Sequence, residues 1–77
     1  MIQIHLRFYE ELNDFLPKDK HKVLFAHTIS LGTTVKDAIE SLGVPHTEID
    51  LILVNSKSVA FDYQLKNNDQ IAVYPTF

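Results

Sequence analysis

Histidines are the residues of this chain whose chemistry would most readily bind a metal ion. The chain has four of them and no cysteine, so a metal site would depend on imidazole and carboxylate ligands. No two histidines stand four residues apart on a predicted helix. His5 and His27 could face each other across a hairpin, but two imidazoles without a third ligand form a weak site. We therefore predict surface or edge-strand histidines and no metal site.

The carboxylates and hydroxyl groups do not form a recognisable catalytic arrangement. Asp37 and Glu40 lie on the exposed side of a predicted helix, while Ser56 and Ser58 lie in a turn with no neighbouring histidine and no nucleophile elbow. Asn67–Asp69 reads as a polar turn, and the two glycines form no phosphate-binding loop. A chain this small also struggles to enclose a pocket of roughly 300 Å³. We predict no catalytic residue, no cofactor and no enzyme, unless a partner subunit completes a site.

Charge and composition exclude several further classes of protein. Seven basic against ten acidic residues give a net charge of −3, and the one basic cluster, Lys18 to Lys22, is interrupted by Asp19 and reads as a solvated loop. We therefore expect no direct nucleic-acid binding. No signal peptide and no apolar run of about 20 residues is present, which predicts a protein without a membrane span. The lack of cysteine fits a cytoplasmic location, although a secreted domain is open on that ground alone.

The elements that would position these residues begin with two strands. Period-two alternation predicts a strand from Ile2 to Tyr9 with one buried face. A short helical turn at residues 10–16 and a polar turn lead to a second strand from Lys22 to Ile29, antiparallel to the first. Both alternate sets of this second strand contain apolar residues. We favour an inward set with a large aromatic area, Val23, Phe25 and Ile29.

One helix follows the first hairpin. Val35, Ala38, Ile39 and Leu42 form an apolar stripe at helical spacing, which predicts a helix from Val35 to Leu42. Thr34 with Asp37 three residues later resembles a capping box, and Gly43 can end the helix. A helix this short must lie across a sheet to be stable.

Three further strands complete the expected sheet, at residues 51–54, 58–61 and 70–74. A turn or short helical stretch is expected at residues 62–66. The order β-β-α-β-β-β predicts a single α+β domain, residues 1–77, with one helix packed on one face of a mixed sheet. Because the first and last strands are both strongly patterned, we expect them parallel and paired at the centre of the sheet.

The surface that remains is best suited to bind another protein. Large apolar residues end the chain, where termini are usually polar, and tyrosine is common at protein interfaces. Phe77 could instead close the core, and the loop after the helix could be a simple turn capped by Thr47. The open face of the sheet and that loop together give the candidate interface residues His5, Arg7, Pro45, His46, Tyr74, Pro75 and Phe77.

Three segments of the chain resemble one known family. Residues 7–17, 39–55 and 68–75 are similar to the ubiquitin-like domain that precedes the Mut-seven C-terminal, PIN-like RNase domain of bacterial proteins. The run Gly43-Val44-Pro45-His46-Thr47-Glu48 is the most specific part, and the resemblance covers essentially the whole chain. It implies a β-grasp fold and a non-enzymatic module that docks on or regulates a PIN-like RNase in RNA processing.

The same resemblance extends to the sulfur carriers of molybdopterin and thiamine synthesis, MoaD and ThiS. In those carriers the last strand leads into a Gly-Gly tail, which an E1-like enzyme adenylates before it becomes a thiocarboxylate. Residues 71–75 look like that last strand and its following proline, but Thr76 and Phe77 stand where the glycines would be. The alternative function is therefore a carrier-like protein with an E1-like adenylating partner, and the bulky Phe77 argues against direct sulfur transfer.

Overall fold

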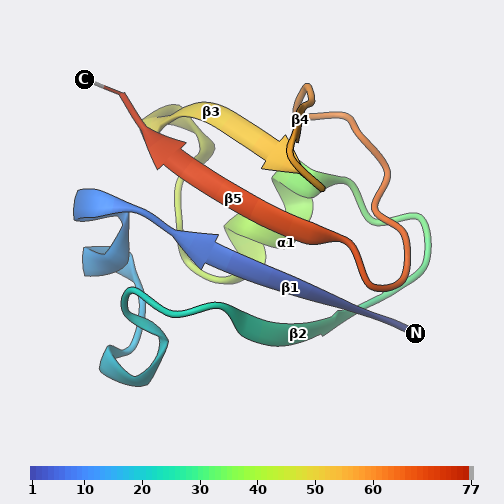
Figure 1. Ribbon diagram of the computed structural model, residues 1–77, viewed down its shortest axis with the longest axis horizontal. Helices are drawn as coiled ribbons and strands as arrows, with labels where there is room; N and C mark the ends of the chain where they lie inside the picture. The colour runs from blue at the N-terminus through green and yellow to red at the C-terminus, as the bar shows by residue number, and fades with distance from the viewer. Residues whose placement is uncertain (77) are drawn as a thin grey trace.

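The computed structural model describes residues 1–76 and shows one α-helix behind a five-stranded sheet (Figure 1). Along the chain the strands and the helix are β1 (Ile2–Phe8), β2 (Phe25–Ile29), α1 (Val35–Ser41), β3 (Ile49–Val54), β4 (Lys57–Ser58) and β5 (Gln70–Pro75). Three short 3-10 helices connect them, η1 (Glu10–Phe15), η2 (Lys18–Lys20) and η3 (His46–Glu48).

The sheet is mixed, with the order β2-β1-β5-β3-β4. The first and last strands, β1 and β5, run parallel and side by side in its interior, while the other neighbours are antiparallel (Figure 1). A parallel pair needs a long crossover connection, and the chain between β1 and β5 contains the helix and the remaining strands. The predicted α+β fold and the predicted pairing of the terminal strands are confirmed.

The core lies between the sheet and α1. Alternate side chains of β1 point to this side and are fully buried, as are those of β5 and β3, because successive residues of a strand face opposite ways. The helix contributes its predicted stripe to the same core. The core residues that these four elements bury are Ile4, Leu6, Phe8, Val35, Ala38, Ile39, Ile49, Ile52, Val54, Ile71 and Val73.

The ends of α1 follow the signals in the sequence. The Thr34 hydroxyl accepts a hydrogen bond from the Asp37 backbone N–H at 3.2 Å, so Thr34 is the N-cap. Gly43 takes a left-handed conformation, with φ of +91°, and the helix ends before it. The last helical residue is Ser41, one residue earlier than predicted, because Leu42 has left the helical conformation and serves as the C-cap.

The second strand starts later than the sequence suggested. Lys22 has a φ of +58°, which breaks the extended chain, and its backbone N–H donates to the Asn13 side chain at 2.9 Å. β2 therefore begins at Phe25, and the expected inward position of Val23 was wrong, since this side chain is 44% exposed. Phe25 and Ile29 do face the core, as predicted.

The register of the first hairpin separates the two histidines that could have faced each other. His5 pairs with Ala26, whereas His27 pairs with the buried residue Ile4. Paired residues of antiparallel strands share a face, so His5 and His27 lie on opposite faces of the sheet. The possible cross-hairpin pair of imidazoles does not form.

The fourth strand is the largest departure from expectation. β4 covers only Lys57 and Ser58, not residues 58–61, because a tight turn at Asn55 and Ser56 (φ of +51° and +72°) gives a very short hairpin. Beyond it the chain turns back to the core, where Phe61 packs. Residues 62–66 form a turn and an isolated bridge between Gln64 and Thr34, and no helical stretch. No helix among residues 1–76 is long and apolar enough to cross a membrane.

Candidate protein-interaction site

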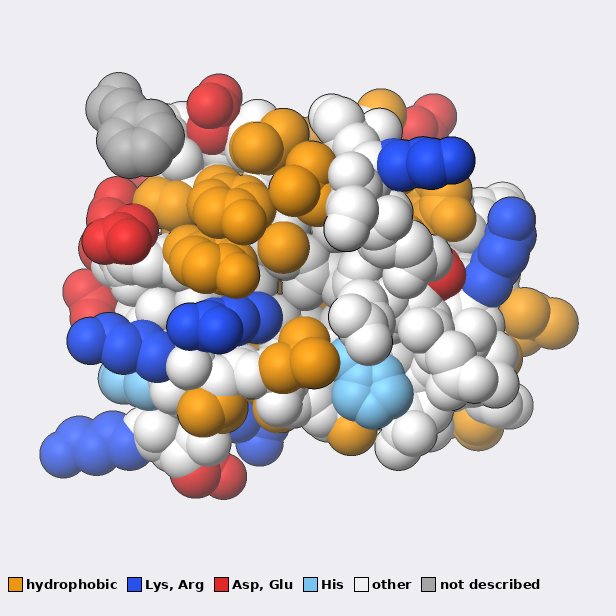
Figure 2. All heavy atoms as spheres, viewed as in Figure 1, with side chains coloured by type: hydrophobic (Ala, Val, Ile, Leu, Met, Phe, Trp, Pro, Cys, Tyr) orange, Lys and Arg blue, Asp and Glu red, His pale blue; other side chains and the backbone are white. Residues whose placement is uncertain are grey.

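The face of the sheet opposite α1 carries the candidate site and is here called the open face. Figure 2 shows hydrophobic side chains gathered on it over β5, β3 and the end of β1, with basic side chains beside them. The same alternation that buries one side of each strand directs the intervening residues here. Leu51 of β3, for example, is 39% exposed on this face.

Strand register arranges the open face in three rows. Tyr9, Tyr74 and Leu51 form the first, with Tyr74 contacting both neighbours. The second row is Arg7, Ala72 and Leu53, in which Ala72 of β5 pairs with the other two residues. The third is His5, Gln70 and Asn55, where His5 pairs with Gln70 and the Gln70 backbone N–H donates to the Asn55 side chain at 3.0 Å.

Two tyrosines form the aromatic part of the site. The rings of Tyr9 and Tyr74 stack with centroids 4.3 Å apart and planes 10° from parallel. The guanidinium carbon of Arg7 lies 5.1 Å from the centroid of the Tyr9 ring, within the range of a cation–π contact. The nearby Tyr9 hydroxyl favours the neutral form of Tyr74 and raises the pKa of Tyr74 above its ordinary value. The three side chains support one another on the open face.

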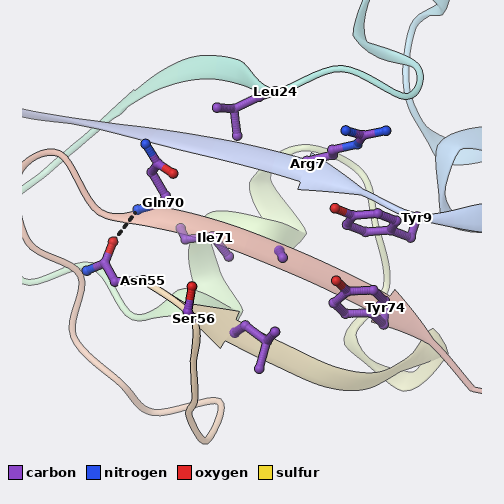
Figure 3. Close-up of a pocket in the computed structure, with 10 residues that line it drawn as sticks. Arg7, Tyr9, Leu24, Asn55, Ser56, Gln70, Ile71 and Tyr74 are labelled. Carbon is purple, nitrogen blue, oxygen red and sulfur yellow. Dashed lines mark hydrogen bonds between the residues drawn. The ribbon is translucent and has the colours of Figure 1, made fainter.

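A hollow of about 360 Å³ lies on this face beside the tyrosines (Figure 3). Ala72 is the smallest side chain of its row, so the hollow forms between the longer neighbours on either side. In Figure 3 both tyrosine hydroxyls point along the strands toward the hollow, and Asn55, Ser56 and Gln70 border its far end. The expectation from chain length concerned an enclosed pocket, whereas this hollow is open and its walls belong to the outer surface of the sheet.

The structure brings some of the predicted interface residues together and separates others. His5, Arg7 and Tyr74 share the open face. Pro75, the last residue of β5, is buried and pairs with Ile49. Phe77 lies outside the described residues.

Pro45 and His46 belong to a different part of the surface. The His46 ring lies against Phe61 and its Nδ1 is 2.6 Å from a carboxylate oxygen of Glu40 on α1. Hydrogen bonds from the His46 side chain and backbone lower the pKa of Glu40 below its ordinary value. This loop is therefore tied to the helix side of the molecule, and it does not join the open face.

Residues that the sequence did not single out complete the site. Tyr9 was expected on the outward side of β1, but its contact with Tyr74 depends on the parallel register of β1 and β5. Leu53 and Ala72 likewise become part of one row only through pairing. Leu24, which precedes β2, also lines the hollow and is 50% exposed. The period-two pattern predicted which residues face outward, but it did not predict these contacts between strands.

The groups available for metal binding do not gather on the open face. Within residues 1–76 no three His, Asp or Glu side chains lie close enough together to hold an ion. Two carboxyl groups have several polar partners each. Glu40 pairs with His46 and Lys36, and the buried Asp69 accepts hydrogen bonds from the Asn55 side chain and the Lys66 backbone N–H. Both arrangements fix turns and loops of the fold.

A mixed sheet whose terminal strands run parallel, with one helix across one face and an open opposite face, defines the protein as ubiquitin-like, with the β-grasp fold. The whole chain, residues 1–77, matches the model of the Mut7-C ubiquitin family, so the protein belongs to that family. The resemblance noted in the sequence is thereby confirmed. No curated protein sequence matches the chain.

Solved structures of small β-grasp proteins superimpose over nearly the whole chain. Small archaeal modifier protein 1 of Haloferax volcanii is similar with a TM-score of 0.76 and 15% identity, covering 100% of both chains. A Pyrococcus furiosus protein described as molybdopterin converting factor, subunit 1, has a TM-score of 0.74 and 17% identity, also covering 100% of both. Urm1 of Trypanosoma brucei follows at 0.68 and 18%, covering 97% of this chain and 92% of that one. At these identities the likeness shows the fold alone.

Proposed function

We propose that the protein is a non-enzymatic module that binds another protein through its open face. The observation that carries this proposal is the cluster of Tyr9, Tyr74, Leu51 and Leu53 beside Arg7, which exposes aromatic and aliphatic groups on the outer surface of the sheet. Tyrosine and arginine are among the residues most enriched where alanine substitution weakens protein complexes. An apolar cluster rimmed by polar groups is typical of an interaction surface.

The fold supports a binding role in a second way. Strands β1, β5 and β3 hold the cluster on a rigid sheet, and the Tyr9–Tyr74 stack fixes both rings before a partner arrives. A surface that is already ordered loses less conformational entropy on binding than a mobile loop does. The open face is therefore suited to a specific partner.

For the partner we propose a PIN-like RNase, which the module would dock on or regulate. The support is the family itself, since the Mut7-C ubiquitin model spans the chain, and this step rests on family association. The test is an affinity pull-down from native cell extract, with the captured proteins identified by mass spectrometry. The proposal expects a nuclease that the wild-type protein captures and that Tyr74→Ala loses.

A matched control separates the open face from the rest of the surface. Lys36→Ala removes a half-exposed charge on α1, away from the open face, so it should capture the nuclease as the wild-type protein does. Loss of capture in both variants, or recovery of an E1-like adenylating enzyme alone, would contradict the nuclease proposal. The second of those outcomes would favour a different function.

That second candidate is a carrier or modifier activated at its C-terminus. It is favoured by the similarity over the full chain to small archaeal modifier protein 1 and to the molybdopterin converting factor subunit. Such a protein would react through its C-terminal carboxylate, which attacks the α-phosphate of ATP and releases pyrophosphate to give an acyl adenylate. Incubation with ATP and an E1-like enzyme, followed by intact-mass spectrometry, should then show the acyl adenylate. With sulfide added, the mass should become that of a thiocarboxylate, as sulfide displaces AMP. An unchanged mass, with an enzyme proven active on its own carrier, would exclude this role.

A further inference from the structure

We infer that the hollow over Ala72 receives an apolar side chain of the partner while Arg7 binds a carboxylate next to it. This inference rests on the proposed binding function and specifies the chemistry of the partner segment. The inference rests on the position of Ala72, a small residue between the longer side chains of Arg7 and Leu53, with the Arg7 guanidinium on one side of the hollow.

The shape of the hollow selects the apolar group. Ala72 forms its floor, and Leu24 and Leu53 contribute apolar surface. The Tyr74 ring stands as a wall (Figure 3). A side chain placed there would cover exposed hydrocarbon on several sides, which is the arrangement that gives anchor residues their large contribution. The volume of about 360 Å³ accommodates an aromatic or a branched aliphatic side chain.

Charge selects the second group. Arg7 is the only charged residue that lines the hollow, and it forms no ion pair with any residue in the range 1–76. Its contact with the Tyr9 ring holds the guanidinium near the edge of the hollow. Since the whole chain has a net charge of −3, this local positive charge runs against the overall sign. A carboxylate is the group that a guanidinium binds most specifically, through paired hydrogen bonds.

The surroundings of Arg7 agree with an acidic partner. A second depression, on the other side of Arg7, is lined by Lys22 and Glu10. The charges of these two residues cancel, so the charge around Arg7 remains positive. At the far end of the hollow the Gln70 amide and the Ser56 hydroxyl take part in no side-chain hydrogen bond within residues 1–76, whereas Asn55 is held by Asp69. Those two groups remain available to the backbone of a partner segment.

The test uses N-acetylphenylalanine, which places a carboxylate beside an apolar side chain, and its neutral amide as the matched probe. Each is titrated at low salt, up to about 20 mM, into the full ¹⁵N-labelled chain, because small ligands of this kind bind weakly. Amide signals of residues around Ala72 should shift with both probes. The carboxylate should bind about threefold more tightly than the amide, as expected for a partly exposed ion pair.

Three variants connect the shifts to the proposed groups. Arg7→Gln should keep the binding of the amide and remove the advantage of the carboxylate, while Lys36→Gln on α1 removes the same charge and should change neither. Ala72→Val fills the hollow, suits a strand, and should abolish the shifts caused by both probes. Dispersed amide spectra of each variant verify that the fold is kept, and Arg7→Gln tests the carboxylate independently if Ala72→Val fails to fold.

Several results would overturn the inference. Shifts elsewhere on the surface, no shift up to the highest concentration, equal binding of acid and amide, or tighter binding of the cationic probe phenethylamine would each do so. None of them would refute the binding function itself, because nuclease capture that depends on Tyr74 would still stand. Loss of that capture, with the probes binding as expected, would instead refute the nuclease proposal and leave the chemistry of the hollow intact.

Discussion

The stacked tyrosines should stabilise the fold as well as line the site, and a double-mutant cycle can measure this. Tyr9 follows β1 and Tyr74 lies in β5, so their contact joins two strands that are separated by more than sixty residues of sequence. The perturbation is removal of either ring, or of both, by Tyr9→Ala and Tyr74→Ala. The cycle isolates the contact because the loss of strand preference and of other contacts cancels between single and double variants.

The geometry sets the expected coupling. The centroid distance of 4.3 Å is slightly shorter than the usual lower limit of about 4.5 Å for aromatic pairs, and the planes are nearly parallel. Such pairs contribute about 0.5–1.5 kcal/mol beyond the area that they bury. We expect a coupling of about 1 kcal/mol between the two positions, with each single variant less stable by about 1–2 kcal/mol. For a domain of this size, each 1 kcal/mol corresponds to a Tm shift of about 4–8 °C.

Urea unfolding followed by far-UV circular dichroism measures the free energies without relying on tyrosine fluorescence, which the substitutions change. The third tyrosine of the chain, Tyr63, packs against the core and supplies the control. A Tyr63→Ala and Tyr74→Ala cycle should give a coupling near zero, because the two side chains share no contact among the aromatic pairs of residues 1–76. A Tyr9–Tyr74 coupling below about 0.3 kcal/mol, the usual error of such cycles, would show that the rings are not held together in solution.

Three further predictions concern polar groups of the fold. Asn13→Ala should lower the free energy of unfolding, measured in urea, by about 3 kcal/mol. The buried Asn13 amide donates to the carbonyls of Phe8 and Glu10 and accepts from the Lys22 backbone N–H, and all three hydrogen bonds would be lost. The neighbouring Asp14 is exposed, so Asp14→Ala should change the free energy of unfolding by less than about 0.5 kcal/mol. Burial, and secondly the charge of Lys20, lower the pKa of His27 from its ordinary value of 6.5, so the unfolded chain binds the proton more readily. Stability should therefore fall as the pH drops below 6.5, and His27→Gln should flatten the urea midpoints in that range; an unchanged slope would contradict the burial of the ring. Hydrogen bonds from His46 lower the pKa of Glu40 below 4.5, so this pair should stabilise the fold above that pH and lose its effect as the pH falls through the lower native value. A ¹³C titration of the Glu40 carboxyl should show the lowered pKa, and His46→Ala should return it toward 4.5.

The sequence predicted those parts of the fold in which one pattern dominates. Alternation in β1, the apolar stripe of α1 and the capping residue Thr34 each have a single interpretation, and each is present in the structure. β2 was less well predicted, because Val23 and Leu24 look like strand residues but lie exposed beyond the positive φ of Lys22. β4 was misplaced for a similar reason, since Val59 and Phe61 are drawn to the core after the hairpin has ended.

The candidate site was predicted in outline only. Alternation places Arg7 and Tyr74 on the outward faces of their strands, but it cannot say which residue of β1 lies beside which residue of β5. The stack of Tyr9 on Tyr74, and the row that leaves Ala72 between Arg7 and Leu53, both depend on that register. For the loop after α1, the sequence offered His46 as a candidate but gave no sign of its contact with Glu40, which joins this loop to the helix side.

The most direct measurement of the central claim is photo-crosslinking inside living cells. A photoreactive amino acid is placed at Gln70, at the rim of the hollow on the open face, and in a second strain at Asp37, exposed on α1. Binding through the open face predicts one protein adduct from the Gln70 position and none from the Asp37 position. An adduct from Asp37 with no adduct from Gln70 would place the partner on the helix side and contradict the claim.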